Sequence, residues 1–347
     1  MRPAPIPLCV IGGGSIGMRH ISCAVASDMV ALTAVVEQDA EQRAVLTARG
    51  LHVVADVSDV PAQTKGAIIA TPTPHHANVA MDCLSRGWAI LVEKPLTQTV
   101  AEADALCRQA QTAGLPLYAG HHRRCHPFVT TARATMDQLG HMVAVQGIWS
   151  LRKHDTYFDV PWRTTAGAGP VLTNLSHEVD LLHCLAGPIT EVSALYSNAA
   201  RGLEVEDTTA IALRFASGAL GTFIMSDAGA SPWAFEAATA ENPAITVRGD
   251  DPLRFIGTSG SMSFPSLQMW KGAKGQPTDW QHAMIPKAGP ELDKVDGIAV
   301  QLDRFAAVVR GAQDDLLATG EDGRRTMLVI DAIQRAARTS KTQSISA

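Results

Sequence analysis

Apolar residues in the first third of the chain fall into short runs separated by longer segments of helical character. The short runs are typical of buried strands and lie at residues 8–11, 31–36, 66–70, 89–92 and 115–119. The segments between them that indicate helices are 40–49, 77–86 and 100–113. This alternation predicts a parallel sheet with helices on both faces.

The pattern changes near residue 123, where strand-like runs become dominant. One helix is expected at 128–139, and two more at 300–310 and 324–338. The strand-like runs are 143–151, 189–197, 208–215 and 221–226. They predict a large, mostly antiparallel sheet with one open face. Such a face needs a cover, and we expect a second copy of the chain there, in a homodimer or homotetramer.

A glycine-rich turn joins the first apolar run to the first helix. Gly12, Gly14 and Gly17 form the G-x-G-x-x-G pattern of a dinucleotide-binding turn. Gly12 permits the tight turn, Gly14 lets the backbone approach a pyrophosphate, and Gly17 lets the helix pack near the strand. The amides of Ser15 and Ile16 then face the phosphates at the helix N-terminus.

These features together predict an α/β protein of two domains. Residues 1–123 are expected to form a dinucleotide-binding Rossmann domain with a doubly wound parallel sheet. Residues 124–347 are expected to form an α/β domain with the open sheet, for substrate binding and oligomerisation. Its C-terminal helices can pack back on the first domain.

Glu37 ends the second strand, twenty residues after Gly17, where an acidic side chain holds the adenosine ribose. Its carboxylate accepts hydrogen bonds from both ribose hydroxyls and repels a 2′-phosphate. Gln38 and Asp39 follow, so no arginine stands next to it, and NAD is the expected cofactor. Arg43 is close enough in sequence to leave NADP as the alternative.

Composition narrows the class of protein. The chain is 46% hydrophobic and 18% charged, as in soluble globular enzymes, and its net charge of −5 gives no reason to expect nucleic acid or an anionic membrane as partner. No apolar run reaches the length of a bilayer span, and the first strand starts too early for a signal peptide. The six cysteines form no C-x-x-C pattern, and we expect reduced core thiols in a cytoplasmic protein.

Lys94 is the first candidate catalytic residue, in Glu93-Lys94-Pro95 at the end of a strand. A lysine there can place its ammonium between the nicotinamide ribose and a substrate hydroxyl and stabilise the alkoxide formed as hydride leaves. Pro95 restricts Lys94 to extended geometry and favours a cis peptide bond, which fixes the direction of the side chain. An exposed lysine in a turn is the alternative.

A second cluster lies at residues 167–180, where a glycine loop precedes a predicted helix. Thr173 or Asn174 is placed to cap that helix. Asn174, His177 and Asp180 follow at intervals of three, on neighbouring rows of one face. Asp180 could orient the imidazole of His177, which could then take the hydroxyl proton of an alcohol. A structural histidine is the alternative.

The order of these motifs resembles the Gfo/Idh/MocA family of oxidoreductases. They are the G-x-G-x-x-G start, the Ala-Thr-Pro-x-x-x-His loop at 70–76, Glu93-Lys94-Pro95 and His177-Glu178-Val179-Asp180, with a G-T-x-G-S turn at 257–261. The resemblance implies dependence on NAD(P), no metal, and frequent dimers or tetramers. It also implies that Lys94 and His177 flank the hydride-transfer site.

The resemblance and the position of the loops extend the list of contacts. The 70–76 loop lies where ligands collect, so cofactor contacts are expected at Thr71, Pro72 and His76, as well as at Glu93 and Lys94. His122 follows the last strand of the first domain, where a family residue often meets the nicotinamide. Trp162 and Arg163 match a family position near the cofactor.

Substrate contacts are expected at Lys94, Arg123, Tyr157, Arg163, Asn174 and His177. Tyr157 would lie at the rim of the site, and either arginine suits a carboxylate. For His122 and Arg123, pairing between the domains is the alternative.

The chain departs from the family at one position. Many members carry an aspartate four residues before the histidine, in D-x-G-x-H, where this chain has Thr173. A subgroup has asparagine three residues before the histidine, so we expect Asn174 to contact a substrate hydroxyl. The missing carboxylate leaves proton transfer to His177 or to Lys94.

Three functional hypotheses follow. The first is an NAD-dependent dehydrogenase that oxidises a secondary alcohol of a cyclic polyol or sugar, reversibly. The second keeps this chemistry but takes an aromatic cis-dihydrodiol, with carboxylates bound by Arg123, Arg124 or Arg163. The third is a regulator that binds the dinucleotide without turnover. Intact Lys94 and His177 argue against the regulator, and the lost aspartate argues for it.

Overall fold

The computed structural model describes residues 4–165, 169–242, 245 and 249–346. The chain forms two compact units: the residues up to His126 with Val295–Met327, and Pro127–Lys294 with the residues from Leu328 onward. This division differs from one at 123/124, because the segment 295–327 belongs to the first unit. Leu302 and Phe305 of that segment are fully buried in the first unit's core.

The first unit contains a six-stranded sheet in the order β3-β2-β1-β4-β5-β6, and every neighbouring pair is parallel. The strands are β1 (Ile6–Ile11), β2 (Val30–Val36), β3 (Val53–Val54), β4 (Gly66–Ile69), β5 (Ala89–Val92) and β6 (Leu117–Ala119). This is the predicted Rossmann sheet. The strand order reverses between β1 and β4, and in sheets of this kind ligands bind at the carboxyl ends of the strands beside the reversal.

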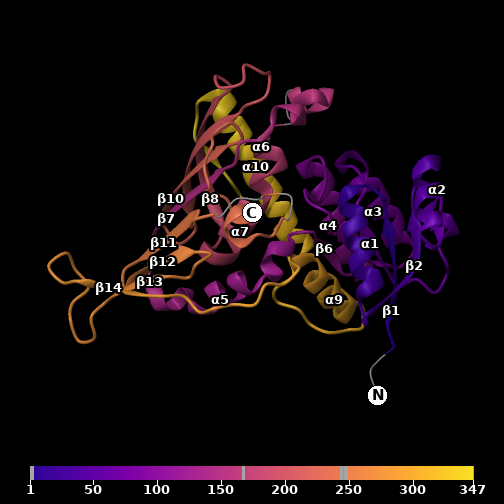
Figure 1. Ribbon diagram of the computed structural model, residues 1–347, viewed down its shortest axis with the longest axis horizontal. Coiled ribbons are helices and arrows are strands. Elements are labelled where there is room, and N and C mark those ends of the chain that lie inside the picture. Colours follow the sequence, from indigo (N-terminus) through magenta and orange to yellow (C-terminus); the bar gives the residue numbers. More distant parts are fainter. Residues whose placement is uncertain (1–3, 166–168, 243–244, 246–248, 347) are drawn as a thin grey trace. The chain divides into compact units, whose positions relative to one another are not determined.

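Helices cover both faces of this sheet, as predicted (Figure 1). Alternate residues of β1 point to opposite faces: Leu8 and Val10 share a core with α1, α2 and α9, and Cys9 and Ile11 share one with α3 and α4. The helices are α1 (Ser15–Ala26), α2 (Ala40–Ala48), α3 (His76–Ser85), α4 (Val100–Ala113) and α9 (Gly297–Val309). Burying the side chain of a residue such as Leu8 or Val10 contributes roughly 1.5–3 kcal/mol to the stability of the fold.

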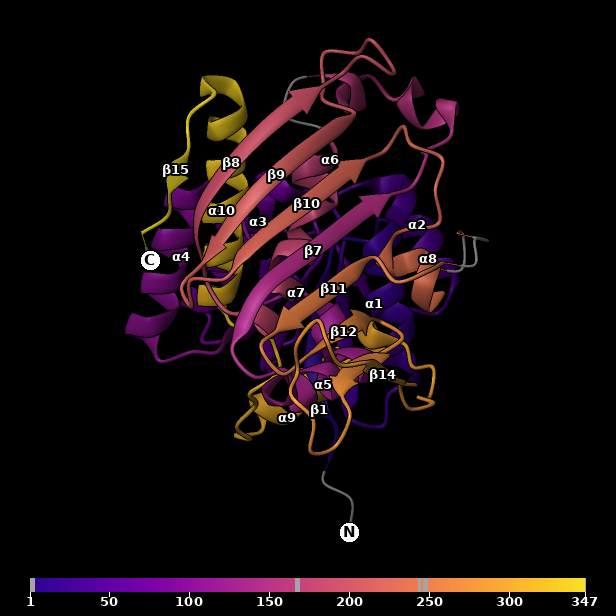
Figure 2. The same ribbon diagram turned by 90° about the vertical axis from the view of Figure 1, so that its left-hand side faces the viewer.

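The second unit contains a nine-stranded sheet in the order β14-β13-β12-β11-β7-β10-β9-β8-β15 (Figure 2). Its central pair, β7 and β10, is parallel, and its other neighbouring pairs are antiparallel. The expected mostly antiparallel sheet is therefore confirmed. The strands are β7 (Met142–Ser150), β8 (Ile189–Ser197), β9 (Thr208–Phe215), β10 (Leu220–Ser226), β11 (Leu253–Gly257), β12 (Gly260–Phe264), β13 (Met269–Gly272), β14 (Met284–Lys287) and β15 (Gln343–Ser344).

One face of the nine-stranded sheet packs on helices, and the other is open (Figure 2). Phe223 of β10 is buried, and its neighbour Ile224 is exposed on the opposite side. Ile224 stands beside Ile148 of β7 and Ala210 of β9, and Ala210 stands beside Leu195 of β8. These four residues form an apolar row across the open face, and Leu195 has 69% of its surface exposed.

The helices of the second unit differ from the predictions in detail. The helix expected at 128–139 ends early, as α5 (Pro127–Thr135) followed by the 3-10 turn η4 (Met136–Leu139), and α8 (Phe235–Thr239) was not expected. The glycine loop leads into two helices, α6 (Pro170–Thr173) and α7 (Leu175–Ala186). The last helix, α10 (Gly320–Thr339), contains the boundary between the two units.

The G-T-x-G-S segment at 257–261 forms the turn between β11 and β12. The remaining short 3-10 helices are η1 (Val57–Asp59), η2 (Thr73–His75), η3 (His122–Cys125), η5 (Asp155–Asp159) and η6 (Pro161–Thr164). Within the described ranges, no helix is long and apolar enough to cross a bilayer. Cys9 and Cys83 are buried free thiols, and burial raises the pKa of Cys9 to about 12.

Candidate active site

The turn between β1 and α1 has the backbone that the glycine pattern predicts. Gly12 has a φ of +103°, and a side chain there would collide with the carbonyl of Ala70. A Cβ on Gly17 would collide with the carbonyl of Gly12, so α1 can start close to β1 only because Gly17 lacks a side chain. At Gly14, no atom of the described residues lies within 4 Å of the Cβ position. Here the backbone is open to a ligand.

Two further observations show that this turn fits NAD. Ser15 and Ile16 begin α1, and no side chain caps the helix at Gly14. Uncapped N-terminal amides attract a pyrophosphate. Thr71 follows β4, and its hydroxyl is buried without a hydrogen-bond partner among the described residues. A buried orphaned hydroxyl at this edge of the sheet is a group that a bound ligand can satisfy.

Glu37 lies at the end of β2 with its carboxylate held by two backbone amides. Oε2 accepts a hydrogen bond from the amide of Gly13 at 2.7 Å, and Oε1 accepts one from the amide of Asp39 at 2.9 Å. The guanidinium of Arg43 donates to the carbonyls of Glu37 and Gln38. A carboxylate and a cation therefore lie side by side where the ribose is expected.

His76 connects the loop after β4 to the loop after β5. Its Nε2 lies 2.8 Å from the carbonyl oxygen of Thr71, and its Nδ1 lies 2.9 Å from that of Pro95. Carbonyl oxygens only accept hydrogen bonds, so both bonds form together only when the imidazole carries both protons. Pro72 precedes His76 at the start of η2.

Glu93 and Lys94 follow β5 at the same edge of the sheet. The Glu93 carboxylate is buried, with Oε1 2.7 Å from Nε2 of His20 on α1 and Oε2 accepting from the amide of Lys94 at 3.1 Å. Burial acts to raise the pKa of Glu93, but the hydrogen bond from His20 and the nearby positive charges outweigh it and lower this pKa to about 2. The Lys94–Pro95 peptide is cis, as expected.

His122 and Arg123 lie in η3, just after β6, and both are buried. Arg123 has 2% of its surface exposed. The next residue, Arg124, forms an ion pair with Asp322 at 3.2 Å, and the positive charge lowers the pKa of Asp322 against the opposing effect of burial. The roles of His122 and Arg123 in binding remain predictions.

In the second unit, Asn174 lies at the junction of α6 and α7. The residue occupies the cap position of α7, but its side chain makes no capping hydrogen bond, so the expected cap is wrong in this respect. Instead, its Oδ1 accepts hydrogen bonds from Nζ of Lys153 at 3.1 Å and from the hydroxyl of Thr173 at 2.9 Å. His177 and Asp180 lie on α7, and both are buried.

Lys153 follows β7 and was not among the predicted site residues. Its ammonium contacts Asp227 at 3.4 Å and lies 4.6 Å from the centre of the Tyr157 ring. Burial lowers the pKa of Lys153, and the guanidinium groups of Arg201 and Arg163 act in the same direction against the attraction of Asp227. Lys153 is thus held by contacts with Asn174, Asp227 and the Tyr157 ring, and it is a further candidate for binding substrate.

Arg163 and Tyr157 form a second contact in the same region. The guanidinium lies 4.1 Å from the centre of the Tyr157 ring and donates to the Tyr157 carbonyl at 2.9 Å. Trp162 lies in η6, and its side chain falls outside the described part of the structure. The structure therefore brings together Lys153, Tyr157, Arg163 and Asn174 within the second unit.

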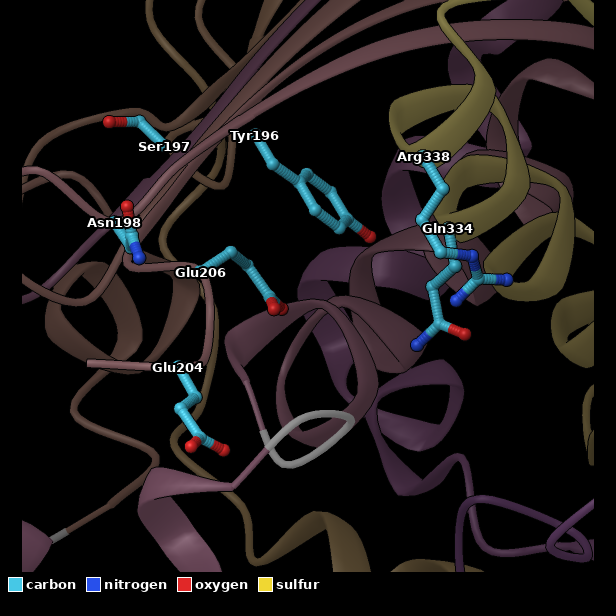
Figure 3. A pocket seen from close by; sticks show the side chains of 7 residues that line it. All are labelled: Tyr196, Ser197, Asn198, Glu204, Glu206, Gln334 and Arg338. Carbon is cyan, nitrogen blue, oxygen red and sulfur yellow. The ribbon is translucent and has the colours of Figure 1, made fainter. Parts of the chain in front are cut away.

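A separate cavity of about 310 Å³ opens at the end of β8 (Figure 3). Tyr196 stands between Glu204 and Glu206 on one side and Gln334 and Arg338 of α10 on the other. Glu206 Oε1 accepts from the amide of Val171 in α6 at 3.2 Å, and burial raises the pKa of Glu206. The cavity thus borders α6, the short helix that ends just before Asn174.

The fold and the turn define a class of protein, an oxidoreductase with an NAD-binding Rossmann domain and a second α/β domain. Two family models match the chain: "Oxidoreductase family, NAD-binding Rossmann fold" over residues 6–121, and "GFO/IDH/MocA C-terminal domain" over residues 129–263. The chain belongs to the Gfo/Idh/MocA family of NAD-binding oxidoreductases.

Several curated relatives are named as dehydrogenases. The chain is 28% identical over 232 residues to 4-carboxy-2-hydroxymuconate-6-semialdehyde dehydrogenase of Sphingobium sp., covering 63% of this chain and 71% of that protein. It is 25% identical over 351 residues to inositol 2-dehydrogenase 2 of Paenarthrobacter aurescens, covering 95% of each. The WlbA dehydrogenase of Bordetella pertussis, solved with NADH and UDP-GlcNAcA, shares the fold with a TM-score of 0.76, at 21% identity and 99% coverage of both chains.

Proposed function

We propose that this NAD-dependent dehydrogenase oxidises a secondary alcohol of a cyclic polyol or sugar, in a reversible reaction. The observation that supports the proposal most is the placement of Lys94 at the carboxyl edge of the Rossmann sheet, anchored through Glu93 and Pro95. The full-length similarity to an inositol dehydrogenase supports the polyol class.

NAD, when bound, accepts a hydride at the nicotinamide C4. Gly12, Gly14 and Gly17 would hold its pyrophosphate with the amides of Ser15 and Ile16, and Glu37 would hold the adenosine ribose. Contacts at Thr71, Pro72, His76, His122, Trp162 and Arg163 complete the proposed set. Arg43 keeps NADP as the weaker alternative.

Lys94 and His177 are proposed to act on the same substrate hydroxyl. The ammonium of Lys94 would stabilise negative charge on the substrate oxygen, and the imidazole of His177 would accept the hydroxyl proton. Thr173 cannot replace the family aspartate as a base, because a neutral hydroxyl has far lower affinity for a proton than a carboxylate; its one proton lies within hydrogen-bond reach of Asn174 Oδ1 and of the Gly169 carbonyl. The side chain of Asn174, which accepts a hydrogen bond from Lys153, would form a hydrogen bond with a neighbouring hydroxyl of the substrate.

An aromatic cis-dihydrodiol that carries a carboxylate is the second candidate substrate. It is favoured by the cations around Tyr157, since the Lys153 ammonium and the Arg163 guanidinium both lie against that ring. Guanidinium groups bind carboxylates in a bidentate geometry. The name of the Sphingobium relative also contains a carboxyl-bearing compound.

The test is reduced-nicotinamide absorbance with NAD, then NADP, across polyols, aldoses and carboxylated and plain dihydrodiols. Turnover should appear with NAD, and Lys94→Ala should lower kcat by about 10²- to 10⁴-fold. Lys65→Ala, at an exposed lysine of the same unit, is the matched control and should leave kcat unchanged.

Each outcome points to one hypothesis. Turnover confined to polyols or aldoses supports the first substrate class, and turnover confined to dihydrodiols supports the second. Tight NADH binding without turnover on any compound would favour a dinucleotide-binding regulator. Equal kcat in Lys94→Ala and the wild type would refute the proposed role of Lys94.

We also propose that two copies of the chain associate through the open face of the nine-stranded sheet. The apolar row of Leu195, Ala210, Ile224 and Ile148 supports this arrangement, because an exposed apolar row on a sheet is typical of an interface.

A further inference from the structure

His20 is a buried residue that the proposed reaction does not use. It lies on α1, three residues after Gly17, and no part of it is exposed. Its Nε2 is 2.7 Å from Oε1 of Glu93, across 73 positions of the sequence. One side chain therefore links the helix of the dinucleotide turn to the segment that carries Lys94.

Glu93 connects His20 to the backbone of Lys94. The second carboxylate oxygen, Oε2, accepts the backbone amide of Lys94, so both oxygens of Glu93 are engaged inside the protein. Gly120 lies beside this carboxylate, and a Cβ there would stand only 3.1 Å from Oε2, so Glu93 fits in this place because residue 120 is a glycine. The buried side chain of Glu93 is thus held at one oxygen by His20 and at the other by the amide of Lys94.

His76 anchors the other end of the same turn through the carbonyl of Pro95, at 2.9 Å. The backbone of Lys94 is therefore fixed from both directions, by Glu93 before it and by Pro95 after it. Of these anchors, the one through Glu93 acts on the Lys94 amide itself.

We propose that His20 is a positioning residue for the reaction, which acts through Glu93 to fix the backbone and hence the direction of Lys94. The proposal rests on the proposed role of Lys94. A buried polar pair of this kind contributes little net stability compared with apolar residues of the same shape, so its value lies in the geometry that it imposes. A displacement of about 1 Å at a reacting group can cost about 100-fold in rate.

The test compares two replacements of His20. Gln places an amide nitrogen near the position of Nε2 and can still donate to Glu93, whereas Leu has similar bulk and cannot. His20→Leu should lower kcat by about 10- to 100-fold with little change in NADH affinity. His20→Gln should keep kcat close to that of the wild type. His52→Leu, at an exposed histidine of the same unit, is the matched control.

A second measurement does not depend on the substrate. Competitive acetylation followed by mass spectrometry gives the reactivity of Lys94 relative to the exposed Lys65 as a function of pH. We expect the pH profile of Lys94 to change in His20→Leu and to remain unchanged in His20→Gln and His52→Leu. If His20→Leu does not fold, His20→Asn replaces it, because the shorter amide cannot reach Glu93.

The outcomes separate this proposal from the proposed function. A changed Lys94 profile in His20→Leu with no turnover in any variant, wild type included, would retain the positioning role and remove the proposed reaction. Wild-type turnover that His20→Leu leaves intact, with an unchanged Lys94 profile, would overturn the positioning role. Equal losses in His20→Leu and His20→Gln would also overturn it, because the hydrogen bond to Glu93 would then not be the cause.

Discussion

Glu37 and Arg43 show how closely two opposite charges can stand at a site that selects a cofactor. The carboxylate of Glu37 is fixed by the amides of Gly13 and Asp39, and it cannot turn away from an added phosphate without losing both hydrogen bonds. The Arg43 guanidinium is held by the carbonyls of Glu37 and Gln38. Discrimination between the two dinucleotides therefore depends mainly on the carboxylate.

We predict that Glu37→Ala weakens NADH binding by about 10- to 100-fold, because hydrogen bonds to a charged group contribute about 1.5–3 kcal/mol. NADPH binding should weaken less or improve, since Arg43 stays in place while the repelling carboxylate is gone. Fluorescence titration with each reduced cofactor measures the ratio. Glu41→Ala, at an exposed position of the neighbouring helix α2, is the control. An unchanged ratio in Glu37→Ala would show that Glu37 does not select the cofactor.

Among the elements, the loop between β8 and β9 holds α6 in place through Glu206. The carboxylate accepts the amide of Val171 and lies over Gly169, where a Cβ would collide with it. Burial raises the pKa of Glu206, the charge of Asp227 adds to this, and the backbone amides oppose it. The native state therefore binds the proton more tightly than the unfolded state. Stability is lost as pH rises from the ordinary pKa of a glutamate through the raised one.

Glu206→Gln should remove this pH dependence while keeping an oxygen for the Val171 amide. We expect the Tm of the variant to rise relative to the wild type as the pH increases from the ordinary pKa of a glutamate through the raised one, and then to keep a constant offset. Calorimetry across this range measures it. Glu204→Gln, on the rim of the same cavity, should show no such trend. A constant offset at every pH would contradict the assignment.

On the scale of the whole molecule, the proposed association of two copies depends on the open face of the nine-stranded sheet. We predict that Ile224→Glu shifts the protein from dimer to monomer, because it places a charge within the apolar row between Ala210 and Ile148. Light scattering after gel filtration measures the mass. Val25→Glu, at an apolar residue of α1 with 65% of its surface exposed, should leave the mass unchanged. A dimer that persists in Ile224→Glu would place the interface elsewhere.

The features that could be predicted from the sequence are those marked by residues close together in the chain. Continuous apolar runs located β1, β4 and β5, and the spacing of Gly12, Gly14 and Gly17 located the turn between β1 and α1. The contacts that were missed join residues far apart in sequence, such as Lys153 with Asn174 and His20 with Glu93. A lysine or histidine in such a pair has no periodicity of its own, and its burial depends on a distant partner. The strands from β11 to β14 are short, and their apolar residues alternate too briefly to be distinguished from loops.

The first unit is built from two segments that lie far apart in the chain, and this has a consequence for its synthesis on the ribosome. One layer of its core contains Leu8 and Val10 from the start of the chain, and Leu302 and Phe305 from a segment nearly three hundred residues later. Translation proceeds from the N-terminus, so all of Pro127–Lys294 is made before this layer can close. The unit that is begun first is thus completed late, and for most of translation the sheet face that α1 and α2 cover lacks its third helix, α9.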